Sequence, residues 1–248
     1  MNAPLVVDVV IPALDEEQAL PRVLREIPRE PFETHGGSGP PRTAQVRRIV
    51  VADNGSRDRT AEVARASGAE VVVEPRRGYG AACLRALASL RDQPPDVVVF
   101  LDGDYSDYPA ELPALVAPIV RGEVHLVIGS RTTGRRESGS LTPQQRVGNA
   151  IACGALRILY RARYSDLGPF RAIRWSTLQT LEMADRDYGW TVEMQVKAAR
   201  LGIPHGEVPV SYRRRIGESK VSGTIRGTLG ASRKILWLLA RHAGPFAP

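Results

Sequence analysis

The first 130 residues alternate short apolar runs with segments that carry the pattern of an α-helix. The apolar runs that we expect to form strands are residues 6–11, 48–51, 71–73, 97–101 and 126–129. Helical patterns lie between them at residues 15–27, 60–67, 80–90 and 109–120. Continuously apolar strands are buried on both faces, and strand–helix–strand units join parallel strands. The alternation therefore predicts an α/β domain with a mostly parallel central sheet flanked by helices.

The remaining segments are expected to extend this sheet or to lie at its surface. Residues 28–45 contain four prolines and three glycines, and we interpret them as a surface insertion. Residues 131–145 are polar and rich in glycine and serine, which predicts a mobile loop. Further helices are expected at residues 146–160 and 190–201, with a short strand near residues 207–212.

The end of the chain has a different pattern. Within residues 224–241, four apolar side chains fall roughly on one helical face, and four basic ones lie largely elsewhere. We therefore expect a single domain over residues 1–222, followed by a basic amphipathic helix and tail over residues 223–248. That helix could dock on an anionic bilayer or pack on the core of the domain.

Composition excludes several classes of protein. The 248 residues are 43% hydrophobic and 25% charged, which is ordinary for a globular protein and excludes a disordered tail, a fibre and a disulfide scaffold. Asp8 and Asp15 interrupt any apolar signal sequence, and no run approaches the ~20 residues of a membrane span. With only Cys83 and Cys153 present, we expect a cytoplasmic protein.

The charge balance predicts anionic partners. The formal net charge is +7, and 34 residues are Lys or Arg, of which only three are lysines. Arginine binds phosphate with two parallel hydrogen bonds, so some of these residues could clamp phosphate groups. A GC-rich genome would also explain the excess of arginine. Charge alone leaves nucleic acid, phosphorylated metabolites and an acidic membrane surface open as partners.

Acidic residues follow three of the expected strands. The strands lead into Pro12–Ala13–Leu14–Asp15–Glu16, Asp53–Asn54–Gly55–Ser56 and Asp102–Gly103–Asp104. Ligands of open α/β sheets bind at the carboxyl ends of the strands. One such carboxylate alone would be read as a turn former. Three at the same edge predict a binding site.

Asp102–Gly103–Asp104 is the strongest single motif. Its two carboxylates, separated by a glycine that permits a sharp turn, can face one divalent cation. Carboxylate oxygens suit Mg²⁺ or Mn²⁺, which take further ligands from substrate phosphates. The four histidines are scattered, so zinc is not expected. The alternative is a simple turn after the strand.

Two further motifs bear on phosphate binding. Gly78–Tyr79–Gly80 mimics a dinucleotide fingerprint but follows the third strand, and we interpret it as a tight turn into a helix N-terminus near phosphate. Residues 213–220 group four cations around the flexible Gly217. Such runs are often solvated surface, but this one could close over a diphosphate.

Taken together, these motifs resemble family-two glycosyltransferases with the GT-A fold, and among them the dolichyl-phosphate mannose or glucose synthase-like branch. The resemblance runs from about residue 6 to 222. It is carried by residues 10–17, 53–56, 102–104, 129–131, 166–171 and 214–220, in that order. It implies an α/β GT-A domain and transfer of a sugar from a nucleotide donor.

The resemblance also assigns roles to individual residues. Pro12, Glu16 and Asp53 would hold the base and ribose, and Asp102, Gly103 and Asp104 would hold the metal and diphosphate. Arg131, Arg146, Arg214 and Lys220 would bind donor or acceptor phosphates. Three positions depart from the family pattern: Leu14 replaces a base-stacking aromatic residue, Asn54 replaces a second Asp, and Pro169 interrupts the usual Ser-Gly-Phe run.

The expected reaction follows from these roles. We expect a metal-dependent transfer of a hexose from a UDP- or GDP-sugar to a polyprenyl phosphate, and the resemblance implies that the transfer inverts the anomeric centre. A phosphate with a pKa of about 6 needs no general base. Asp104 and Arg214 are the expected catalytic residues, and residues 131–145 are the expected acceptor loop. A lipid acceptor would be reached peripherally at the inner face of the membrane or through a separate membrane protein.

Three alternatives remain. With a soluble hydroxyl acceptor, Asp166 or Glu193 would have to act as the base, although Glu193 could simply pair with Lys197. A sugar-phosphate nucleotidyltransferase would normally open with a Gly-rich loop, which is missing after the first strand. A nucleic-acid-binding protein would explain the charge but not the acidic strand ends, so we expect no nucleic acid partner.

Overall fold

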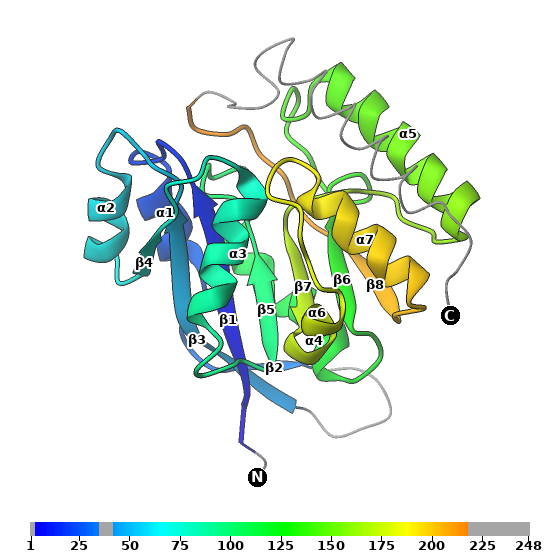
Figure 1. The fold of residues 1–248 in the computed structure, drawn as a ribbon, viewed down its shortest axis with the longest axis horizontal. Helices are drawn as coiled ribbons and strands as arrows, with labels where there is room; N and C mark the ends of the chain where they lie inside the picture. Colours follow the sequence, from blue (N-terminus) through cyan, green and yellow to red (C-terminus); the bar gives the residue numbers. More distant parts are fainter. Residues whose placement is uncertain (1–2, 35–41, 218–248) are drawn as a thin grey trace.

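The computed structural model describes residues 3–34 and 42–217. These residues form a mixed eight-stranded sheet with helices on both faces (Figure 1). The strands are β1 (Leu5–Ala13), β2 (Phe32–Thr34), β3 (Arg42–Asp53), β4 (Glu70–Val73), β5 (Val97–Phe100), β6 (Leu126–Ser130), β7 (Arg171–Arg174) and β8 (His205–Pro209). They lie in the order β2-β3-β1-β5-β7-β6-β8. Strand β4 pairs in parallel with the carboxyl-terminal end of β3.

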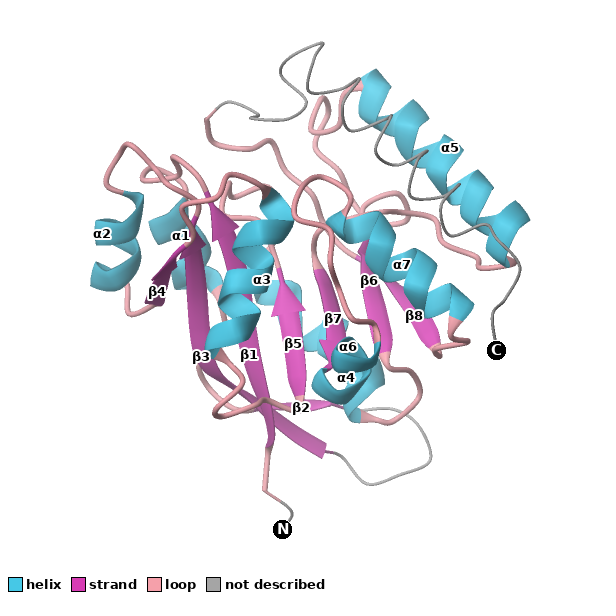
Figure 2. Ribbon diagram, viewed as in Figure 1, coloured by secondary structure: helices cyan, strands magenta, loops and turns pink. Residues whose placement is uncertain are grey.

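The helices connect these strands (Figure 2). They are α1 (Leu20–Glu26), α2 (Thr60–Ala66), α3 (Tyr79–Ser89), α4 (Leu112–Val120), α5 (Pro143–Tyr160), α6 (Trp175–Thr180) and α7 (Trp190–Arg200), with a 3₁₀ turn at Pro109–Glu111 before α4. Among the described residues, none of the helices combines the length and apolar character that crossing a membrane would require.

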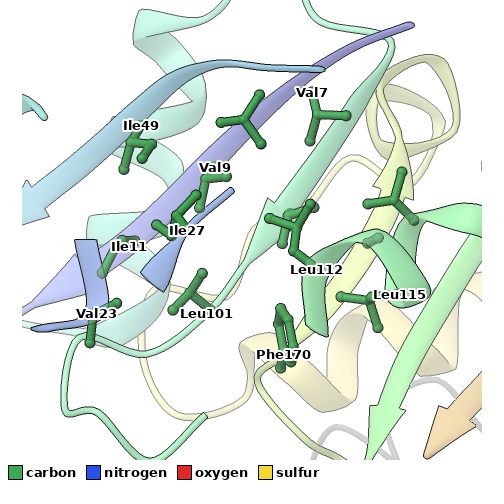
Figure 3. Packing of buried hydrophobic residues seen from close by; sticks show 14 of the residues in the cluster. Val7, Val9, Ile11, Val23, Ile27, Ile49, Leu101, Leu112, Leu115 and Phe170 are labelled. Carbon is green, nitrogen blue, oxygen red and sulfur yellow. The ribbon is translucent and has the colours of Figure 1, made fainter. Parts of the chain in front are cut away.

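Alternate residues of the central strands supply two cores. On one face, Val9 and Ile11 of β1 pack with side chains of α1 and α4 (Figure 3). On the other face, Val10 of β1 and Phe100 of β5 pack with side chains of α3 and α7. This two-sided burial explains why the strands are continuously apolar in sequence, and the expected α/β fold is confirmed.

The sheet is less parallel than the apolar runs predict. Strand β7 lies between β5 and β6 and runs antiparallel to both, and β2 is antiparallel to the start of β3. The sequence of β7, Arg-Ala-Ile-Arg, carries no apolar run. Arg171 is nevertheless fully buried, because its guanidinium donates to the carbonyl oxygens of Leu167, Gly168 and Thr191.

Several boundaries also differ from the expectations. Residues 15–19 form turns rather than the start of α1, and Asp15 has a φ of 53°. Helix α5 begins at Pro143 because Thr142 and Gln145 form a capping box, which shortens the expected loop. Part of the expected insertion forms β2 and the start of β3. The expected C-terminal helix and Lys220 lie outside the described residues.

Phe100 gives a test of this packing. It is fully buried at the end of β5, with its ring 5.9 Å from that of Trp190. We expect Phe100→Ala to lower the free energy of unfolding by about 3–5 kcal/mol, because it leaves a cavity between the sheet and α7. Val73→Ala, at a side chain that is 49% exposed, should change it by well under half as much. Urea unfolding of both variants checks this, and equal losses would contradict it.

Candidate active site

Three loops meet at the carboxyl edge of the sheet, where β1, β3 and β5 end. In the parallel register, Ala13 lies beside Asp53, and the N–H of Asn54 donates to the carbonyl of Ala13 at 2.9 Å. Strand β5 pairs with the other side of β1 and leads directly into Asp102. The acidic strand ends are therefore brought together as the sequence predicts.

The loop after β1 is fastened to the loop after β3. The N–H groups of Asp15, Glu16 and Glu17 donate to side chains of the facing loop, which are Ser56, Thr60 and Asp58 at 3.0, 2.8 and 3.1 Å. Pro12 is buried and Leu14 is half-buried at the start of this loop. The residues predicted to bind the base, Pro12, Leu14 and Glu16, thus lie on the same side of the site as Asp53. Hydrogen bonds between the two loops hold this wall of the site in place.

Asp53 and Asn54 have different functions in this wall. One carboxylate oxygen of Asp53 accepts the N–H of Ser56 at 3.0 Å. The side-chain amide of Asn54 donates to the carbonyl oxygens of Glu74 and Arg76 and accepts the N–H of Gly78. An ionised Asp could not donate to two carbonyls. Asn54 therefore departs from the family pattern because it ties β3 to the segment after β4.

Gly78 and Gly80 serve close packing. A Cβ on either would lie 2.1 Å from a carbonyl oxygen, of Arg186 and Asp185 respectively. The N–H groups of Gly80 and Ala81 donate to carbonyls of the same segment. The first turn of α3 is therefore occupied by protein, and our interpretation of this turn as a phosphate site was wrong.

The turn after β5 crowds three carboxyl groups. Asp104 is 3% exposed and accepts hydrogen bonds from the N–H and hydroxyl of Ser106 at 2.9 and 2.5 Å. Asp102 accepts the hydroxyl of Tyr79 at 3.0 Å. Burial and the charge of Asp104 raise the pKa of Asp102 to about 6. Burial and the charges of Asp102 and Asp104 raise the pKa of Asp107 well above its ordinary range.

These groups fit a divalent cation whose coordination a ligand completes. Within the described residues, Oδ1 of Asp107 is buried without a hydrogen-bond partner. The same part of the chain holds no group of three or more His, Cys, Asp or Glu side chains arranged to bind a metal by themselves. Both oxygens of Asp104 have partners in the structure, Oδ1 in Ser106 and Oδ2 in the guanidinium of Arg215. A cation held by Asp102 and Asp104 would therefore replace the Arg215 contact, and Mg²⁺ or Mn²⁺ would take its other ligands from phosphate oxygens and water.

Arg215 lies against this acidic turn. Its guanidinium forms an ion pair with Asp104, and it reaches there from 111 residues away in sequence. Arg215 lies within the basic run at residues 213–220, but the family resemblance assigns the phosphate role to its neighbour Arg214. The only sequence signal for it was the run of three arginines at residues 213–215.

The other two arginines of the run have separate contacts. Arg213 is buried, stacks 3.3 Å over the ring of Tyr105 and pairs with Glu26 at 2.7 Å. Arg214 donates from its side chain to the carbonyl of Ser138 and from its N–H to Glu137, both in the loop before α5. The structure thus places Arg214 on the predicted acceptor loop and Arg215 on the predicted metal site.

Arg131 and Asp166 form a buried pair beside this site. Asp166 is fully buried, and its two oxygens accept Nη2 and Nε of Arg131 at 2.7 and 2.8 Å. The N–H of Arg131 also donates to Asp166, and the guanidinium lies 5.0 Å from the centre of the Tyr212 ring. Both oxygens of Asp166 are therefore engaged. Arg146 is exposed on the first turn of α5.

Glu193 is also engaged in structure. It pairs with Lys197 at 2.8 Å and accepts the N–H groups of Ala184 and Asp185. It holds the segment that packs on the first turn of α3. The structure therefore does not bring Glu193 into contact with the acidic turn after β5.

The chain matches one family model and several known proteins. The family model described as Glycosyl transferase family 2 matches residues 8–187. An uncharacterised glycosyltransferase of Mycobacterium tuberculosis is 39% identical over 90% of this chain and 93% of its own length. A dolichyl-phosphate hexose transferase of Haloferax volcanii is 33% identical over 86% of this chain and 85% of its own length.

A solved structure matches across almost the whole chain. Glucosyl-3-phosphoglycerate synthase from Mycobacterium tuberculosis, in complex with Mn²⁺, UDP-glucose and phosphoglyceric acid, superposes with a TM-score of 0.71 and 25% identity. The match covers 97% of this chain and 80% of that one.

The crowded carboxyl groups predict a pH dependence. The pKa of Asp102 is about 6 in the folded protein and 3.8 ordinarily, so the folded state binds this proton more tightly than the unfolded chain. The resulting stabilisation is complete below pH 3.8 and is lost as the pH rises through about 6. Asp102→Asn cannot ionise and does not lose this stabilisation. Its free energy of unfolding relative to the wild type should therefore rise by about 2–3 kcal/mol as the pH goes from 4 to 7.

Urea unfolding at several pH values, with EDTA present, measures this difference. Parallel stability curves for the two proteins over that range would contradict the assignment. Asp92→Asn, at an exposed carboxylate, is the matched control and should follow the wild type.

Proposed function

Since this chain belongs to glycosyl transferase family 2, we propose that it transfers a hexose from a UDP- or GDP-sugar to a polyprenyl phosphate. The observation that carries the proposal is the buried acidic turn after β5, which faces Arg215 at the carboxyl edge of the sheet. Carboxylates alone would repel a diphosphate, so this arrangement suits a diphosphate only together with a cation.

Asp102 and Asp104 would hold the divalent cation, with Asp53, Pro12 and Glu16 on the side of the base and ribose. When bound, Mg²⁺ or Mn²⁺ supplies positive charge against the diphosphate leaving group. Arg215 adds a guanidinium at the same place, because it already contacts Asp104. The resulting charge stabilisation at the leaving group is the main electrostatic demand of glycosyl transfer.

The acceptor side favours a phosphate nucleophile. A hydroxyl acceptor needs a base, but both oxygens of Asp166 are bonded to Arg131, and Glu193 is bonded to Lys197 and two N–H groups. A phosphate is largely ionised at neutral pH and needs only positioning. Arg131 and Arg146 would position it, and a single displacement would invert the anomeric centre.

A second candidate keeps the donor and changes the acceptor. The similar solved structure is that of a glucosyl-3-phosphoglycerate synthase, whose name indicates a small phosphorylated acceptor. A soluble hydroxyl acceptor is therefore the alternative. A hydroxyl acceptor would require another base, or the loss of the bonds that Asp166 and Glu193 form in this structure.

The first test measures release of nucleoside diphosphate from UDP- and GDP-sugars with Mn²⁺ or Mg²⁺, with and without a short polyprenyl phosphate. Release should depend on both the metal and the lipid phosphate. Asp104→Asn should lower it by at least about a hundredfold because it removes a ligand of the cation, whereas Asp92→Asn should not. Full activity of Asp104→Asn would contradict the site, and release that ignores the lipid would favour the soluble acceptor.

The neighbouring arginines allow a matched comparison. Arg215→Gln should lower kcat by about tenfold or more, because its guanidinium lies at the acidic turn. Arg214→Gln should have a much smaller effect on kcat, because its side chain donates to a loop carbonyl. Steady-state kinetics at saturating metal measure both variants. A larger loss in Arg214→Gln would contradict our placement of the diphosphate beside Arg215.

A further inference from the structure

Helix α5 exposes an apolar stripe. Val147, Ile151 and Ile158 are 59%, 58% and 81% exposed. Their spacing of four and seven residues puts them on one face of the helix. Together with Leu159, they make up four of the seven large hydrophobic side chains that the described part of the chain exposes.

The stripe lies opposite the face that packs on the domain. Ala152, Cys153 and Leu156 are the buried residues of α5, and they belong to the core shared with α7. At 100° per residue, their face points away from the stripe. Figure 1 shows α5 at the outside of the molecule. The helix is thus apolar on two faces, of which packing on the domain explains only one.

Basic residues accompany the stripe. Arg146 and Arg157 are exposed and eleven residues apart, which places both along one edge of it. Arg161 and Arg163 are also exposed just after the helix. Helix α5 contains no Asp or Glu. An apolar stripe with an arginine edge complements a surface that has negative headgroups above hydrocarbon.

The same helix supports the acceptor side of the site. The side chain of Asn149 donates to the carbonyl of Ser165 and accepts the N–H of Leu167. These two residues flank Asp166, which is paired with Arg131. A surface that binds the outer face of α5 would therefore lie against the element that holds the Arg131–Asp166 pair.

We propose that the outer face of α5 docks this protein on an anionic lipid bilayer, with Val147, Ile151 and Ile158 in the interface and Arg146 and Arg157 among the headgroups. This inference goes beyond the proposed reaction, because bilayer binding requires neither donor nor acceptor. A second copy of the chain that docked through its own α5 would have to place acidic groups beside Arg146 and Arg157. Helix α5 contains no acidic residue that could do so. The charge pattern therefore favours the bilayer.

Co-sedimentation of the full chain with vesicles tests the proposal. The wild type should bind phosphatidylglycerol vesicles, bind phosphatidylcholine vesicles weakly, and lose binding as the salt concentration rises. Ile151→Glu with Ile158→Glu should lower the partition coefficient on phosphatidylglycerol vesicles by at least about tenfold, because it removes two apolar side chains from the interface. Val73→Glu with Leu201→Glu is the control. It adds the same charge at side chains that are 49% and 55% exposed elsewhere, and it should bind like the wild type.

Circular dichroism checks that each variant folds, and Ile151→Ser with Ile158→Ser replaces the glutamate variant if that protein unfolds. Failure of the wild type to bind phosphatidylglycerol vesicles would overturn the proposal, as would equal binding by the α5 variant or an equal loss in the control. Light scattering that shows a dimer dissociated by the α5 substitutions, without vesicle binding, would assign the face to a second copy. Donor release to a short water-soluble acceptor should be unchanged in the α5 variant, so the reaction and the docking can fail separately.

Discussion

Electrostatic repulsion among Asp102, Asp104 and Asp107 at the end of β5 is the constraint on which the rest of this site depends. Burial disfavours the ionised form of a carboxyl group, and a neighbouring negative charge disfavours it further. For both reasons the pKa values of Asp102 and Asp107 are raised. Such a turn is stable in its ionised form only with positive charge beside it. Arg215 supplies one such charge from a distant part of the chain. The same demand makes the turn suitable for a divalent cation and a diphosphate.

The surrounding fold holds this turn from two sides. Tyr79, on the first turn of α3, donates to Asp102, and the segment that covers that turn is held by Glu193 of α7. On the other side, Arg213 stacks on Tyr105 and donates to the carbonyl of Asp107. A turn that concentrates like charges would otherwise open toward water. Bonds from α3, α7 and the segment after β8 therefore act together to keep its geometry.

Several buried charged side chains among the described residues serve structure, and this limits what can be inferred from the presence of a carboxylate. Asp166 and Glu193 are carboxylates, the residue type that a general base requires. The sequence alone cannot show whether such a carboxylate acts as a base or serves structure. In the structure their oxygens are bonded to Arg131, Lys197 and backbone N–H groups. Breaking a buried pair leaves an uncompensated charge, so separating either carboxylate from its partners is costly. That engagement makes an acceptor that needs no base the simpler chemical partner for this site.

The sequence by itself determined the α/β class, the order of most elements and the convergence of Asp53, Asp102 and Asp104, because apolar runs and strand ends are local patterns. It could not identify β7, whose arginines find their partners only across the fold. Nor could it tell Arg214 from Arg215, since adjacent residues of an extended segment point to opposite sides and only the packed loops decide which side faces Asp104. Local periodicity determines what an element is. The pairing of charges distant in sequence is decided by tertiary structure, because it depends on distances that exist only after folding.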